Sequence, residues 1–160
     1  MKLKFNSLLL GLILAFAIPP AFADHHGKLV GFWKLVSYEM EIQASGARET
    51  PFGASPTGYI LFAADWRMMV VLTGEGRKPP TTDQDRADIF KNLVAYTGTY
   101  RVEGDKWVTK VDVTGNPAWV GTEQARTFRL DGDRLTEMTA VMNRPDKGMV
   151  RFVLAWERGK

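Results

Sequence analysis

The chain of 160 residues carries 21 lysines and arginines, 18 aspartates and glutamates, and no cysteine. Without residues 1–23, which contain Lys2 and Lys4 but no acidic residue, 19 basic residues face 18 acidic ones. This near-balance excludes an electrostatic case for nucleic-acid binding, and the lack of cysteine excludes disulfides and Cys-based metal sites.

Residues 1–23 have the pattern of a secretory signal peptide: two lysines, an apolar stretch over Leu8–Ile18, and small residues at Ala21 and Ala23. The apolar stretch is shorter than the roughly 20 residues that cross a bilayer, and no second stretch of that size follows. We therefore expect cleavage after Ala23, one domain over residues 24–160, and a soluble protein in the periplasm or outside the cell, without stable membrane insertion.

Strand patterns dominate residues 24–160. Apolar and β-branched runs between turn residues predict eight strands, over Leu29–Gln43, Thr57–Ala63, Arg67–Thr73, Thr97–Glu103, Lys106–Thr114, Glu123–Leu130, Arg134–Met142 and Met149–Glu157. One helix is predicted over residues 82–96, with Thr82 as N-cap and acidic residues in its first turn. Short connections between antiparallel strands favour an all-β fold, an eight-stranded up-and-down barrel with room inside for side chains or one small ligand.

A first hairpin is predicted with residues 104–105, Gly-Asp, as its two-residue turn. This turn places Tyr100 opposite Thr109 on an apolar face. Lys110 and Asp112 then lie on the opposite face and point to solvent, which argues against a role for them in a site.

A second hairpin is predicted with residues 131–132, Asp-Gly, as its turn. In this register Phe128 faces Leu135 and Arg126 faces Glu137, all on one side of the sheet. That side is the buried one, because the other side brings two arginines together near the turn. The hairpin therefore predicts Arg126 and Glu137 as a directly opposed pair inside the barrel.

Several segments carry a family resemblance. The first strand opens with Gly31-Phe32-Trp33, and the segments PFGASPTGYILF, AYTGTYRV, NPAWVGTEQARTFRLDGDRL and LAWER follow. In their order and spacing they resemble the bacterial and fungal lipocalin-like domain family of calycin-type barrels. The resemblance implies that Trp33 plugs the closed end of the barrel and that Arg158 stacks on its indole, a contact worth roughly 0.5–2 kcal/mol.

Trp66 departs from the family pattern, which has an Asp-Gly turn after the second strand. A tryptophan at a turn position that needs positive φ is costly. Its indole is expected either to pack on neighbouring side chains or to be exposed at the barrel rim, where it could touch a partner, a membrane or a ligand.

The barrel contains no histidine, so acid–base chemistry there would fall to Glu, Asp, Lys or Tyr. Arg126 and Glu137 are the best interior candidates, because a charge inside an apolar barrel must be paired and hydrogen-bonded. Either a ligand carboxylate or carbonyl engages the arginine, or the pair only closes the sheet. Further candidates for the pocket wall are Tyr59, Tyr100, Trp119 and Phe128, for each of which core packing is the alternative.

A separate hypothesis concerns Asp24, His25 and His26. If cleavage follows Ala23, the free amine, two backbone amides and the imidazole of His26 offer four nitrogens, a set that suits Cu(II) or Ni(II). The alternative is a loose polar terminus that binds no metal.

We expect a non-enzymatic carrier of a small, mostly hydrophobic molecule, with no cofactor beyond that terminal metal. The first alternative is an isomerase-like or cyclase-like barrel enzyme that uses Glu137 or Tyr100. The second is an interaction module that presents Trp66 and loop 74–82 and whose interior is filled by side chains. The cavity volume separates this last alternative from the other two; the oligomeric state is not predicted.

Overall fold

The computed structural model describes residues 21–159, with the side chains of residues 25–159. In chain order its elements are α1 (Ala21–Leu29), β1 (Gly31–Ile42), β2 (Arg48–Glu49), β3 (Thr57–Phe62), β4 (Arg67–Thr73), α2 (Asp83–Lys91), β5 (Leu93–Glu103), β6 (Lys106–Thr114), the 3₁₀ turn η1 (Pro117–Trp119), β7 (Glu123–Asp131), β8 (Arg134–Thr139), β9 (Met142–Arg144) and β10 (Gly148–Arg158). The predicted signal peptide lies outside the described residues, apart from the start of α1. No helix among residues 21–159 is long and apolar enough to cross a membrane.

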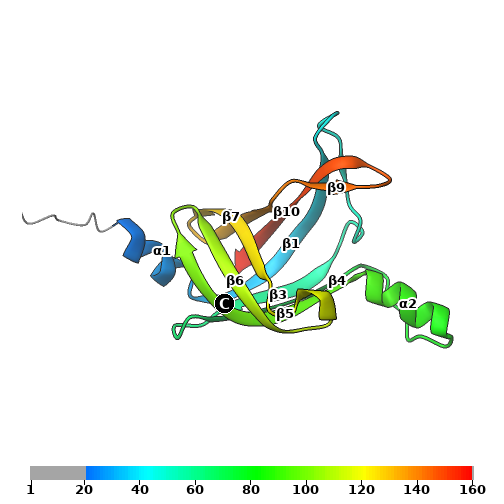
Figure 1. Cartoon of the computed structure of the whole chain (residues 1–160), viewed down its shortest axis with the longest axis horizontal. Helices are drawn as coiled ribbons and strands as arrows, with labels where there is room; N and C mark the ends of the chain where they lie inside the picture. The colour runs from blue at the N-terminus through cyan, green and yellow to red at the C-terminus, as the bar shows by residue number, and fades with distance from the viewer. Residues whose placement is uncertain (1–20, 160) are drawn as a thin grey trace, which may run out of the picture.

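The strands form one closed antiparallel barrel. Each long strand pairs with the next along the chain, and β1 pairs with both β3 and β10, which closes the ring. The short strands β2 and β9 extend the edges of β1 and β10. Figure 1 shows the barrel from the side, with α1 at one end and α2 at the other. The predicted eight-stranded up-and-down barrel is therefore confirmed.

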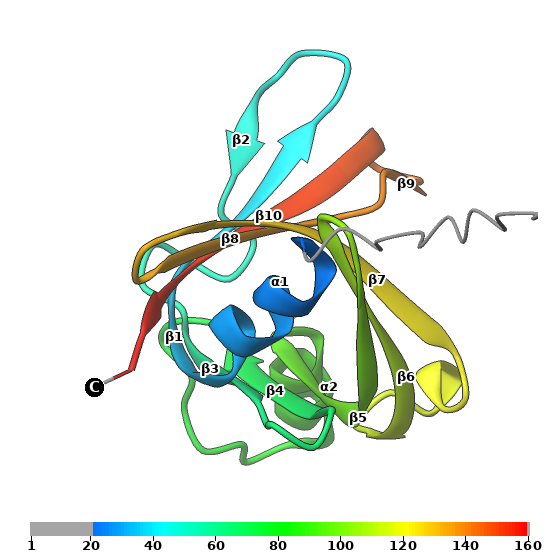
Figure 2. The same cartoon turned by 90° about the vertical axis from the view of Figure 1, so that its left-hand side faces the viewer.

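Helix α1 closes one end of the barrel, where Figure 2 shows it lying across the opening. Trp33 is fully buried beneath it and donates its indole N–H to the Leu29 carbonyl over 2.8 Å. The Arg158 guanidinium carbon lies 4.1 Å from the centre of the Trp33 ring. Arg158 also donates to the carbonyls of Lys28 and Val30. The contact between Trp33 and Arg158 that the resemblance implied is thus present, and it ties the first and last strands to the helix.

Trp66 occupies the tight turn between β3 and β4 with a φ of +67°. Its ring stacks on His26 with 3.7 Å between ring centres, and it also contacts Tyr100. The indole is still 45% exposed. Both expectations are therefore partly met, because the stack covers one face of the ring and leaves the other to solvent.

The first predicted hairpin is confirmed and the second is wrong by two residues. Tyr100 faces Thr109 as expected. In the second hairpin, however, Arg126 faces Thr139 and Glu137 faces Phe128. Gly132 takes the first central position of the turn with a φ of +58°, so the turn is at residues 132–133. A shift by two residues keeps every side chain on its predicted face but separates the Arg126–Glu137 pair.

The predicted helix over residues 82–96 is too long. Thr82 caps it as expected, in a capping box with Asp85, but α2 ends at Lys91. Residues 93–96 instead begin β5 and pair with β4. No residue of α2 is buried, so these residues gain more from sheet hydrogen bonds and burial than from continuing an exposed helix.

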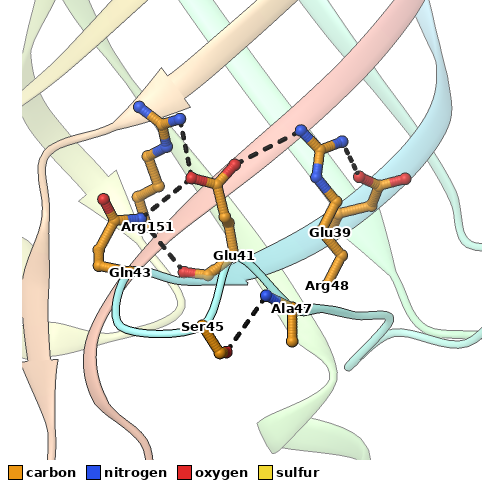
Figure 3. Close-up of polar contacts among 7 residues, drawn as sticks. All are labelled: Glu39, Glu41, Gln43, Ser45, Ala47, Arg48 and Arg151. Carbon is orange, nitrogen blue, oxygen red and sulfur yellow. Dashed lines mark hydrogen bonds and ion pairs between the residues drawn. The ribbon is translucent and has the colours of Figure 1, made fainter.

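A network of charged side chains joins the C-terminal end of β1 to the neighbouring strands, as Figure 3 shows. Arg48 of β2 pairs with Glu39 at 2.7 Å and with Glu41 at 3.4 Å. Arg151 of β10 pairs with Glu41 at 2.8 Å, and Gln43 donates to the same carboxylate. These contacts lie on the outer face of the sheet, because the alternate residues of β1 point inward.

Candidate functional site

A cavity of about 260 Å³ lies inside the barrel. Its walls are mostly apolar and come from β1, β4, β5, β7, β8, β9, β10 and η1. They comprise Tyr38, Val70, Leu72, Val94, Tyr96, Trp119, Gln124, Arg126, Glu137, Thr139, Met142, Phe152 and Leu154. Apolar walls with a few polar groups are typical of small-molecule sites. Side chains therefore do not fill the whole barrel. This disfavours the alternative of an interaction module whose interior is filled by side chains.

The cavity leads to a wider mouth of about 530 Å³ at the α2 end of the barrel. Tyr38, Val94, Trp119 and Phe152 line both spaces and form the neck between them. The far side of the mouth is formed by residues that include Phe90 at the end of α2. Because α1 seals the opposite end, a ligand would enter through this mouth.

Arg126 points into the cavity from β7. It donates one hydrogen bond from Nη1 to the Ala125 carbonyl over 2.8 Å. Among the described residues no carboxylate lies within ion-pair distance of it, and its Nε and Nη2 atoms have no hydrogen-bond partner. The guanidinium lies inside the barrel, yet it is not fully covered, because the cavity leaves part of it accessible. An arginine in this position keeps its charge and presents a free edge to any bound molecule.

Glu137 also points into the cavity, from β8, and is only 5% exposed. Burial raises the pKa of its carboxyl from 4.5 to about 7, although the positive charge of Arg126 opposes this rise. The Trp156 indole N–H also lowers this pKa slightly; it lies close to the carboxyl but outside hydrogen-bond geometry. Near neutral pH the Glu137 side chain is therefore in part a neutral acid.

Tyr38 and Tyr96 place two phenols on the cavity wall. Burial raises the pKa of both hydroxyl groups, so both stay protonated at neutral pH and act as hydrogen-bond donors. Neither hydroxyl has a hydrogen-bond partner among residues 25–159. The Tyr38 ring is held by stacking on Phe52 with 4.4 Å between ring centres, and the Tyr96 ring by an edge contact with Trp119.

Three of the six residues predicted to bind ligand line the cavity, namely Arg126, Glu137 and Trp119. Tyr59 does not, because its neighbours Ile60 and Phe62 point inward, and it stacks on Phe32 on the outer face.

Tyr100 and Phe128 lie in the core closer to α1 rather than on the cavity wall. Tyr100 packs against Phe62, and Phe128 packs against Trp107 and the ring of His25. Both face inward as the hairpin registers required, but on a layer of the barrel that side chains fill.

The cavity residues that sequence reasoning missed include Tyr38 and Tyr96. A β-bulge between Leu35 and Ser37 reverses the alternation along β1, so Trp33 and Tyr38 both point inward although one number is odd and the other even. Tyr96 has a signal in the sequence, because it shares the parity of Tyr100, but the predicted helix over residues 82–96 includes it.

The predicted metal site at residues 24–26 is not tested by an uncleaved chain. Here residues 21–29 are helical, and the His26 ring lies on Trp66. His25 forms a hydrogen bond with the Gly104 carbonyl over 3.0 Å. A metal at the terminus would have to unwind this turn and draw His26 away from Trp66. Within the part of the chain that the structure describes, no group of three or more His, Cys, Asp or Glu side chains could hold a metal.

The closed barrel agrees with what comparison of the sequence with known proteins shows. A search among curated proteins finds no match to this chain. A scan against protein families matches residues 30–159 to a lipocalin-like domain. The match covers every strand of the barrel from β1 to β10, so the chain belongs to the lipocalin-like domain family.

Proposed function

We propose that this protein binds and carries a small, mostly hydrophobic molecule in the barrel cavity. The observation that supports this is the cavity of about 260 Å³, which has mostly apolar walls and leads to the mouth at the α2 end of the barrel. Since one water takes about 30 Å³ of liquid, the cavity has room for on the order of ten non-hydrogen atoms. A longer ligand would extend through the neck into the mouth.

The test uses n-propylbenzene, a neutral molecule of suitable size, and protein labelled at the methionine methyl groups. Met142 is 41% exposed and lines the cavity, whereas Met69 is 51% exposed on the outer face of β4 and does not line it. Binding inside the barrel should shift the Met142 methyl resonance and leave that of Met69 in place. A Val94→Trp variant, which narrows the neck, should abolish the shift. An unmoved Met142, or a shift confined to Met69, would refute the proposal.

One observation favours a second function, that of an isomerase-like or cyclase-like enzyme. The pKa of Glu137, about 7, suits a general base or acid near neutral pH. Tyr100, the other candidate, does not line the cavity. The two functions are separated by the fate of a native ligand that is extracted from the protein, returned to it and recovered: a carrier releases it unchanged, whereas an enzyme returns a different compound.

Export to the periplasm or to the outside of the cell is part of this proposal, and it is supported by the lysines, apolar stretch and small residues of residues 1–23. The test is fractionation of cells that express the full chain, with mass spectrometry of the N-terminus. A protein in the cytoplasmic fraction that still begins at Met1 would refute export.

A further inference from the structure

Several polar groups of the cavity have hydrogen-bond donors without a partner among the described residues. Arg126 has Nε and Nη2 free, and Tyr38 and Tyr96 have free hydroxyl groups. Glu137 offers carboxyl oxygens that also lack a hydrogen-bond partner among these residues, whereas the remaining polar wall residues are partly satisfied. Thr139 donates to the Ala140 carbonyl and accepts from the Phe152 amide, and Gln124 donates to Thr122.

The positive charge of Arg126 determines which charge a ligand of these donors should carry. An arginine inside an apolar barrel is costly unless a negative group lies against it. Glu137 is not that group, because the observed register places it diagonally from Arg126 rather than opposite, and no ion pair joins the two among the described residues. The cavity therefore holds a positive charge that lacks a counterion in direct contact.

The shape of the free edge indicates how an anion would bind there. Nε and Nη2 lie on one side of the planar guanidinium and donate in parallel, which matches the two oxygens of a carboxylate. Much of the remaining wall is apolar and includes Val70, Leu72 and Leu154. We infer that the ligand is an organic monocarboxylate with an apolar body, whose carboxylate binds the Nε–Nη2 edge of Arg126 and the hydroxyl groups of Tyr38 and Tyr96.

This inference rests on the proposed function, because it names the class of molecule that the same cavity takes. The surroundings of Glu137 agree with it. Burial keeps this side chain neutral at mildly acidic pH, so it does not repel a bound carboxylate there and can donate a hydrogen bond to it. A cationic ligand, in contrast, would have to enter beside Arg126.

The test compares three probes that share one body and differ only in their head group: 3-phenylpropionate, 3-phenylpropionamide and 3-phenylpropylamine. Their affinities are measured from the Met142 methyl resonance at about pH 6, where the acid is ionised and the amine protonated. The carboxylate should bind on the order of tenfold or more tightly than the amide, and the amine should bind most weakly.

Two variants assign the preference to Arg126. Arg126→Gln should reduce the affinity for 3-phenylpropionate to that for the amide, while n-propylbenzene still binds. Arg129→Gln removes a positive charge from the exposed face of the same strand and should change neither affinity. The comparison of probes on the unaltered protein does not depend on the folding of either variant.

The possible failures are distinguishable. Equal affinities for acid and amide, with n-propylbenzene still bound, would overturn the inference and leave the proposed function standing. Tightest binding of the amine would also overturn it and would point to Glu137 as the partner of the ligand. If n-propylbenzene and all three probes fail to bind, both the proposed function and the inference are refuted.

Discussion

The buried carboxyl of Glu137 should make the stability of the fold depend on pH. Its pKa is 4.5 in the unfolded chain and about 7 in the folded protein. Below pH 4.5 both states hold the proton, and the group contributes nothing. As the pH rises from 4.5 through 7, the unfolded chain gives up its proton more readily than the folded protein, so the free energy of unfolding falls.

One pKa unit corresponds to about 1.4 kcal/mol, so ionised Glu137 costs the folded state roughly 3 kcal/mol above pH 7. Glu137→Gln keeps the size of the side chain and removes the titration. The free energy of unfolding of this variant minus that of the unaltered protein should rise by roughly 3 kcal/mol as the pH goes from about 4 to about 8. Urea unfolding followed by tryptophan fluorescence measures that difference.

Other ionisable groups cancel in this comparison because both proteins share them. Glu157→Gln is the matched control, since Glu157 is exposed and pairs with Lys34 on the surface. Its difference from the unaltered protein should stay within about 1 kcal/mol over the same range. The reasoning is refuted if the Glu137→Gln difference does not change with pH. It is also refuted if the variant loses stability towards pH 8, because the attraction of Arg126 would then outweigh burial.

Three further predictions concern the frame of the barrel. Gly98→Ala should lower the free energy of unfolding by about 2 kcal/mol or more in urea titrations, because its methyl group would overlap the Lys110 carbonyl. The control Gly27→Ala has open space around the new methyl group and should not destabilise the fold. Arg158→Met should lower the free energy of unfolding by roughly 2–4 kcal/mol, because it removes the contact with Trp33 and the hydrogen bonds to two carbonyls. A urea midpoint equal to that of the control variant Arg129→Met would contradict this. Thr82→Ala should abolish the protection of the α2 amides in a hydrogen-exchange measurement. It should change the free energy of global unfolding by less than about 1 kcal/mol, since α2 buries no residue.

The sequence predicted the barrel well because each strand carries its own evidence. Alternating apolar residues and turn residues act over a few positions, and the first hairpin was predicted to the residue because its turn fixes its register. The error in the second hairpin has a local cause, since Asp-Gly and Gly-Asp turns both fit the sequence Asp131-Gly132-Asp133. Only pairing along the whole strand decides between them.

Local patterns in the chain were enough to predict the fold class, the inward face of Arg126 and Glu137, and the plug of Trp33, since each follows from alternation or from the family pattern. Local patterns do not show which inward residues meet around empty space. The bulge that turns Tyr38 inward, the sheet pairing that takes Tyr96 out of the predicted helix, and the layer that buries Tyr100 and Phe128 all depend on contacts between distant strands. A cavity is the space that such contacts leave open, and no local pattern in the sequence encodes it.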